Sequence, residues 1–246
     1  MSGHSKWHNI QAKKGKADAA RGKVFTKLGR ELAVAAKQGT DPNTNSKLAD
    51  VIAKAKAANM PNDNIKRSIM KASGELSSVN YETLTYEGYG IGGSAVIVNT
   101  LTDNKNRTAG DVRHIFDKFG GNLGTTGSVS FMFENRGVIV IERTVDLTED
   151  VVMDYALDAG ADDVIVMDDV YEIRTQPKDF TAVRKYFEGK NVSFIEADLE
   201  MIPNDKITLS PEQLVAFMKM LDALEDNDDV QDFYHNVELP EEEEEE

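Results

Sequence analysis

A row of cations near the start of the chain is the feature that most directly suggests chemistry. If residues 16–38 form an α-helix, with 100° of rotation per residue, five basic side chains fall within about 80° of one another. These are Lys16, Lys23, Lys27, Arg30 and Lys37, here called the basic stripe. Cations along a helix can follow a phosphate backbone without reading bases, which predicts salt-dependent nucleic-acid binding with weak sequence preference. The alternative is a lysine-rich face that only solvates an alanine-rich helix.

Neighbouring residues extend the basic stripe. Lys6, Lys13, Lys14 and Arg21 continue the positive charge through an N-terminal arm and around the helix edge, and Trp7 could stack on an unpaired base. Of the 28 basic and 43 acidic residues in the chain, residues 1–75 hold 15 and six, a net charge of +9. The rest of the chain therefore carries −24. This asymmetry indicates a phosphate-rich partner for the N-terminal part.

A second candidate site is the DNKNRT segment, residues 103–108. It precedes a predicted helix, whose first backbone amides are unsatisfied and partly positive. Asn104, Asn106, Arg107 and Thr108 could therefore contact a phosphate or RNA. The same residue types are common in turns and caps, and Thr108 with Asp111 has the spacing of a capping box. Both interpretations stay open.

Two glycine-rich stretches, GYGIGG and GGNLGTTG, suggest nucleotide-binding loops at first sight. Neither is followed by GK[ST], and neither joins a strand to a helix in a parallel βαβ unit. We predict a hairpin turn for the first stretch and a helix end with a following loop for the second, where glycine supplies positive φ. Asn122, in the second stretch, is kept as a candidate RNA contact.

Catalytic and metal sites are not indicated. The chain has no cysteine, which removes disulfides, thiolate metal sites and a cysteine nucleophile. His4 and His8 have the spacing of a metal-binding pair on a helix, but no third ligand is evident. The acidic run Asp226, Asp228 and Asp229 lacks the glycine and glutamate of a calcium loop, so solvated surface is expected. We predict a protein that is not an enzyme and has no cofactor, metal or small-molecule substrate.

The hydropathy and the ends of the chain bear on its location. There is no run of 18 apolar residues and no secretory signal, so we expect a cytoplasmic protein with no membrane partner. The chain ends in PEEEEEE. Residues 240–246 are expected to form a solvated, disordered tail, and the alternative is a phosphate mimic that competes for the basic N-terminal part.

Three amphipathic helices are predicted for the basic N-terminal part. The first spans 16–38, the second begins at a cap formed by Asn45 or Ser46 and stops at Met60-Pro61, and the third spans 62–72. The buried face of the first helix is predicted to hold Val24, Phe25, Leu28, Leu32 and Ala35.

From residue 81 the hydrophobic period becomes that of strands. Strands are predicted at 81–87, 94–101 and 128–133, with a helix from Thr108 to Phe119. Residues 137–201 then follow the order β-α-β-β-α-β, which is the ferredoxin-like unit. A helix opened by Ser210-Pro211 and a strand at 230–237 complete the chain.

These elements predict an α+β protein with an N-terminal three-helix domain and two ferredoxin-like α/β sandwich domains, one inserted in the other. The expected domains are 1–78 with its mobile arm, 79–135 together with 204–239, and the insertion 136–203. A helix and a strand alone make a poor domain, which favours the insertion. The alternative is two sequential α+β domains with a separate C-terminal helix.

Four blocks in this order resemble the YebC family, which includes the mitochondrial translational activator of cytochrome c oxidase. They are the opening GHSKWHNIQAKKGKADAARGKVFTKLGRELAVAAKQG, then YEGYGIGG, DNKNRT and GGNLGTTGSV. The resemblance covers the chain up to its acidic tail. It implies a helical domain and two ferredoxin-like domains, one interrupting the other, around a cleft.

The resemblance also implies a set of characteristic positions. They are Gly3, His4, Ser5, Lys6 and Trp7; Arg21, Gly22, Lys23, Phe25 and Lys27; Asp103, Asn104, Asn106, Arg107 and Thr108; and Gly120, Gly121, Asn122, Leu123 and Gly124. The chain departs from the common family form at His8, where alanine is usual, and in its glutamate tail. The first departure weakens a metal interpretation further.

Two functions remain in view. Bacterial relatives are generally described as DNA-binding transcriptional regulators, whereas the mitochondrial branch is implicated in translation, and a ribosomal role at proline-rich stalls is also discussed. The residues show no evident recognition helix and few side chains that read bases, which suits ribosomal RNA better than a DNA sequence. Both hypotheses predict that Lys23, Lys27 and Arg30 drive affinity for nucleic acid.

Overall fold

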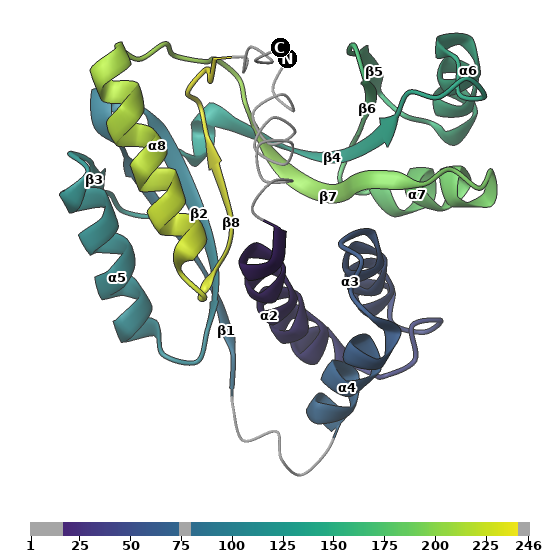
Figure 1. Ribbon diagram of the computed structural model, residues 1–246, viewed down its shortest axis with the longest axis horizontal. Coiled ribbons are helices and arrows are strands. Elements are labelled where there is room, and N and C mark those ends of the chain that lie inside the picture. The colour runs from purple at the N-terminus through teal and green to yellow at the C-terminus, as the bar shows by residue number, and fades with distance from the viewer. Residues whose placement is uncertain (1–16, 74–79, 241–246) are drawn as a thin grey trace.

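The computed structural model describes residues 17–73 and 80–240, which form three parts around the first helix (Figure 1). The N-terminal part consists of α2 (Ala17–Ala36), α3 (Ser46–Ala57) and α4 (Asn62–Ser73). Leu28, Leu32, Leu48, Val51 and Ile65 are buried where these helices meet. The three predicted helices are therefore present, although Val24, predicted to be buried, is 41% exposed.

A buried asparagine fixes the turn between α2 and α3. Asn45 caps α3 by accepting a hydrogen bond from the Leu48 backbone amide. Its side-chain amide donates to the carbonyls of Ala35 and Gly39, at the end of α2. Because one side chain satisfies backbone groups of both helices, it sets where α3 begins relative to α2. Of the two caps predicted, Asn45 is the one used.

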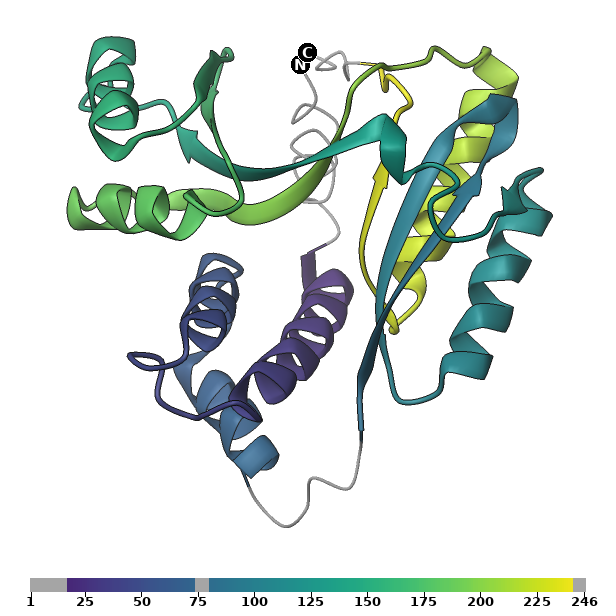
Figure 2. The ribbon, with the colours of Figure 1, turned by 180° about the vertical axis from the view of Figure 1, so that it is seen from behind.

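The second part is a four-stranded antiparallel sheet in the order β3-β1-β2-β8. Its strands are β1 (Glu82–Tyr89), β2 (Ala95–Thr102), β3 (Asn122–Leu123) and β8 (Val230–His235). Helices α5 (Lys105–Lys118) and α8 (Pro211–Asp226) cover one face (Figures 1 and 2). The strand order is that of a ferredoxin-like sheet whose third strand has moved to the start of the sequence.

The third part is a second four-stranded antiparallel sheet, in the order β5-β6-β4-β7. Its elements are β4 (Phe133–Glu142), α6 (Glu149–Ala159), β5 (Asp163–Val166), β6 (Val170–Thr175), α7 (Phe180–Gly189) and β7 (Phe194–Pro203). They follow the predicted β-α-β-β-α-β order. The chain enters through β4 and leaves through β7, and these two strands pair with each other. The whole unit therefore interrupts the second part between β3 and α8, and the predicted fold class is confirmed.

Two local predictions are wrong. The helix predicted to start at Thr108 begins at Lys105, because Asn104 caps it by accepting from the Arg107 amide. Thr108 is buried inside the helix. The strand predicted at 128–133 is replaced by a 3₁₀ turn, η2 (Ser130–Met132), and β4 starts at Phe133, across the domain limit expected at residue 136. We propose the predicted division into three domains, with the inserted domain beginning at Phe133 in place of residue 136.

Candidate nucleic-acid interface

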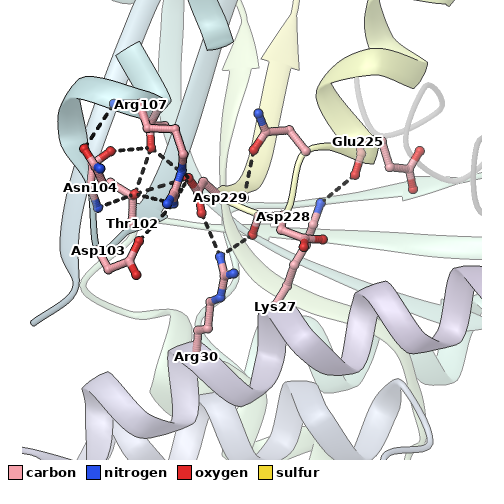
Figure 3. A network of polar contacts seen from close by, with 11 residues as sticks. Lys27, Arg30, Thr102, Asp103, Asn104, Arg107, Glu225, Asp228 and Asp229 are labelled. Carbon is pink, nitrogen blue, oxygen red and sulfur yellow. Dashed lines mark hydrogen bonds and ion pairs between the residues drawn. The ribbon is translucent and has the colours of Figure 1, made fainter. Parts of the chain in front are cut away.

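Three residues of the basic stripe, Lys23, Lys27 and Arg30, contact residues at the end of α8. Figure 3 shows two of them, Lys27 and Arg30. Lys23 Nζ lies 2.6 Å from Asp226 Oδ1, and this hydrogen bond raises the pKa of Lys23. Lys27 Nζ donates to the carbonyl of Glu225 at 3.0 Å. The contacts fall on residues 225–229, here called the acidic segment. The spacing of the stripe thus places these cations on one face, but that face meets another part of the same chain.

Arg30 makes the innermost contacts between α2 and the acidic segment. Its Nη1 atom donates to the carbonyl of Asp228 at 2.6 Å and to Asp229 Oδ1 at 2.9 Å. The Arg30 side chain is 21% exposed and that of Asp229 only 6%. Arg30 therefore forms a partly desolvated ion pair, which water and salt screen less than a surface pair.

Asp229 also anchors the DNKNRT segment. Its second oxygen, Oδ2, accepts from Arg107 Nη2 at 2.6 Å, from Thr108 Oγ1 at 2.8 Å and from Thr102 Oγ1 at 3.2 Å. Burial raises the pKa of Asp229, but the hydrogen bonds from Arg107 and Thr108 outweigh it and lower the pKa overall. The carboxylate is therefore ionised at neutral pH and satisfies four side chains, including Arg30.

The predicted phosphate contacts in DNKNRT are largely used inside the protein. Asn104 caps α5, and Arg107 pairs with Asp103 at 2.9 Å as well as with Asp229. These two carboxylates hold the pKa of Arg107 above its ordinary value, with the Asp229 hydrogen bond as the larger cause. Asn106 lies exposed in the first turn of α5. The segment thus positions Asp229, a role that the sequence analysis did not anticipate.

The glycine-rich stretches serve close packing. A Cβ atom at Gly121 would lie 2.7 Å from the Tyr89 carbonyl, and one at Gly88 would lie 2.6 Å from the Asn122 carbonyl. β3 can therefore approach β1 only through glycine. Asn122 itself is exposed on β3, at the opposite edge of the sheet from β8. It does not join the cluster around Asp229.

Glu87 is a structural residue that the sequence analysis missed. Its carboxylate accepts from the backbone amides of Gly127, Val129 and Ser130 at 2.8–2.9 Å. Burial raises the pKa of Glu87, but these backbone bonds reverse the effect and lower it. One sequence signal could have identified Glu87. It is an acidic residue in the first strand, opposite a glycine-rich loop with free amides.

Charged residues of the inserted part also contact the N-terminal helices. Lys54 on α3 lies 2.5 Å from Asp198 on β7, and Asp50 on α3 pairs with the nearly buried Arg184 at 2.7 Å. Burial raises the pKa of Asp50 despite Arg184. The basic N-terminal part is therefore held by charged residues from both sheets.

A further group of cations faces outward on the N-terminal helices and was not singled out from the sequence. On α4, Lys66, Arg67 and Lys71 point away from the inward Ile65 and Ile69. Lys47 and Lys56 on α3 are also exposed. Across residues 17–73 and 80–240, these five cations form no ion pair.

The remaining predicted contacts divide into two groups. The first group lies outside the described residues and consists of Lys6, Trp7, Lys13, Lys14 and Lys16, with the His4 and His8 pair and the glutamate tail. Arg21 belongs to α2, but its side chain is also outside the described part. Lys37 lies at the end of α2, with Nζ 3.4 Å from Asn80 Oδ1. The structure therefore gathers Lys23, Lys27, Arg30, Arg107 and Thr108, and leaves Lys37 and Asn122 apart.

Within the described ranges, no three His, Asp or Glu side chains are arranged to hold a metal ion. The helices of that same part are too short or too polar to cross a bilayer.

The fold and the charge distribution define a class of protein with a basic three-helix domain on two ferredoxin-like domains. Models of a known protein family match this chain along nearly its whole length. Residues 5–75 match the model described as the TACO1/YebC protein N-terminal domain, and residues 81–237 match the TACO1/YebC second and third domain. The chain belongs to the TACO1/YebC family.

Individual relatives are similar over their full length. A probable transcriptional regulatory protein of Clostridium botulinum (strain Okra / Type B1) is 59% identical over 242 residues, covering 98% of each chain. One of Acetivibrio thermocellus is 59% identical, covering 96% of this chain and 98% of the relative. The crystal structure of the conserved hypothetical protein Aq1575 from Aquifex aeolicus superposes with a TM-score of 0.82. That protein is 41% identical, with 93% of this chain and 95% of the other covered.

Proposed function

We propose that this protein is a non-catalytic, cytoplasmic regulator of gene expression that binds nucleic acid through its basic N-terminal domain. The observation that carries the proposal is the charge segregation, +9 in residues 1–75 against −24 in the rest of the chain. Most cations on the described helices are lysines, which suit phosphate contacts rather than bidentate reading of bases. Relatives named probable transcriptional regulatory proteins support a role in transcription, and for that role we propose DNA as the target.

A second candidate is a ribosome-associated translation factor that binds ribosomal RNA. The small number of base-reading side chains along α2 supports it, because RNA is recognised largely through shape and phosphate. The exposed cations of α4 favour neither target, since duplex DNA and ribosomal RNA both offer closely spaced phosphates.

The test uses Lys66→Ala, Arg67→Ala and Lys71→Ala together, because these side chains are exposed and form no ion pair in the described part of the chain. The control carries Lys178→Ala, Lys185→Ala and Lys219→Ala, which remove the same charge from exposed positions on the sandwich domains. Binding of a labelled DNA duplex and of a labelled RNA hairpin is measured across a salt series. We expect the first variant to weaken binding and reduce the salt slope by about two to three, with the control unchanged.

Sedimentation of cell lysate with and without RNase separates the two targets. Migration with ribosomal particles that RNase and the α4 variant both abolish supports the translation role. Binding of promoter DNA at physiological salt, with no ribosomal migration, supports transcription. If neither the DNA nor the RNA probe binds even at low salt, the proposal that this protein binds nucleic acid is wrong.

A further inference from the structure

The end of α8 carries charges of the wrong sign for a helix C-terminus. Its last turn contains Glu225 and Asp226 and no basic residue. The free carbonyl groups there are already partly negative, so carboxylates are unfavourable and cations are favourable. Lys23 and Lys27, from α2, provide the cations that α8 lacks.

The acidic segment presents to α2 the kind of acceptors that a nucleic-acid backbone presents. Lys23, Lys27 and Arg30 are spaced i, i+4 and i+7 along one helix face, and each contacts a carboxylate or carbonyl oxygen of residues 225–229 at 2.6–3.0 Å. Phosphate oxygens bind the same ammonium and guanidinium groups with the same geometry. A side chain engaged with the acidic segment is therefore not available to a phosphate.

The acidic segment is anchored independently of α2. Thr102, Arg107 and Thr108 all donate to Asp229 Oδ2, whereas Arg30 uses Oδ1. Separation of α2 would break the contacts of Lys23, Lys27 and Arg30 and leave the segment held by its own domain. The outermost contact is open to competitors, because the Lys23 and Asp226 side chains are 43% and 72% exposed.

We propose that residues 225–229 act as an intramolecular competitor for nucleic acid on α2, so that Lys23, Lys27 and Arg30 bind phosphate only after α2 separates from the end of α8. This inference rests on the proposed function and adds its regulation. The apparent affinity is then the intrinsic affinity multiplied by the fraction of molecules in which α2 is separated. A substitution in residues 225–229 that weakens their contacts with α2 should therefore raise the apparent affinity for nucleic acid. The substituted residues themselves do not contact the nucleic acid.

The test removes negative charge from the acidic segment without touching Asp229 or any cation. The variant is Asp226→Asn with Asp228→Asn. The control is Asp222→Asn with Glu212→Gln, which removes two exposed charges from α8, where neither side chain contacts α2. Anisotropy of a labelled DNA duplex and an RNA hairpin gives the affinities. We expect the variant to bind about three- to tenfold more tightly than the control, given the strength of exposed charge contacts.

A distance measurement tests the separation itself. The chain has no cysteine, so spin labels can be placed uniquely at Gln38→Cys and Val215→Cys, both exposed positions on opposite sides of the contact. We expect the distance between labels to lengthen when either probe binds, and a longer population in the variant without probe. Equal affinities for variant and control, or an unchanged distance between the labels in the bound state, would overturn the proposal that residues 225–229 compete with nucleic acid. The proposed function would still stand. If no protein binds either probe at low salt, both proposals fail.

Discussion

Arg30 of α2 and Arg107 of α5 donate to different oxygens of the same Asp229 carboxylate, Oδ1 at 2.9 Å and Oδ2 at 2.6 Å (Figure 3). Two cations, one from α2 and one from α5, thus share one buried anion. The anion also receives two threonine hydroxyls, so its removal would leave several donors without an acceptor.

Asp229→Ala should therefore destabilise the protein by about 3 kcal/mol, because it breaks a buried hydrogen-bonded ion pair. Urea unfolding followed by circular dichroism measures the change. The control is Asp228→Ala, whose exposed side chain is not used by Arg30, since Arg30 binds the Asp228 backbone carbonyl. We expect the control to stay within about 0.5 kcal/mol of the parent. Equal effects of the two substitutions would refute the role given to Asp229.

His235 should make stability depend on pH in a defined window. It is buried against Phe217, and burial lowers its pKa from 6.5 to about 4. The unfolded chain therefore takes up this proton first as the pH falls. Stability should be constant above about pH 6.5 and decline towards pH 4, by up to about 3 kcal/mol.

The carboxylates of Glu87 and Asp229 have lowered pKa values, so their contribution is lost at lower pH than the His235 effect. Between about pH 4.5 and 6.5 the slope should thus report His235, opposed by Asp50, whose pKa is raised by burial. His235→Asn should flatten it in thermal unfolding measured across that range. An unchanged slope in this variant would assign the proton uptake to another group.

Glu87→Gln should loosen the glycine-rich loop. The substitution replaces one acceptor oxygen by an NH₂ group that cannot accept from Gly127, Val129 or Ser130. The remaining oxygen can still accept from Val129 and Ser130, so the NH₂ group faces the Gly127 amide. We expect a loss of about 1–3 kcal/mol and faster hydrogen exchange at Gly127. Glu82→Gln, at an exposed position of the same strand, is the control. Unchanged exchange at the Gly127 amide would show that Glu87 does not hold the loop.

Two glycine substitutions should have opposite signs. Gly121→Ala would bring Cβ to 2.7 Å from the Tyr89 carbonyl and 3.0 Å from Gly90 Cα, both backbone atoms that cannot move aside cheaply. We expect a loss of about 2 kcal/mol or more. Gly110→Ala, inside α5 with open space around the new methyl group, should stabilise by about 0.5–1 kcal/mol. Melting temperatures of the two variants, measured together, check the prediction, and a tolerated Gly121→Ala would contradict the close approach of β3 to β1.

Local signals in the sequence were enough for most of the fold. Asn45 and Ser210 cap helices where the sequence predicted them, because a cap depends on residues within one turn. Thr108 failed as a cap since its hydroxyl has an acceptor in Asp229, 121 residues further along the chain. No local pattern contains that information.

The residues that the basic stripe contacts could not be predicted from the sequence either. The period of Lys23, Lys27 and Arg30 placed them together on one face of α2. Two of their acceptors are the backbone carbonyls of Glu225 and Asp228, and every residue has a carbonyl. Only the tertiary arrangement selects which ones lie within reach. The composition revealed that residues 1–75 and the rest of the chain have opposite charges. It did not reveal that these charges contact each other.

The position of β8 has a consequence for how the protein is made. β8 pairs with β2, and residues 133–203 of the inserted part separate the two in the sequence. During synthesis the outer edge of β2 stays unpaired until the last strand leaves the ribosome, which slows completion of this sheet. The acidic segment directly precedes β8 and emerges equally late. A nascent chain therefore exposes the cations of α2 until residues 225–229 have been made, 198 to 203 residues after their partners on α2.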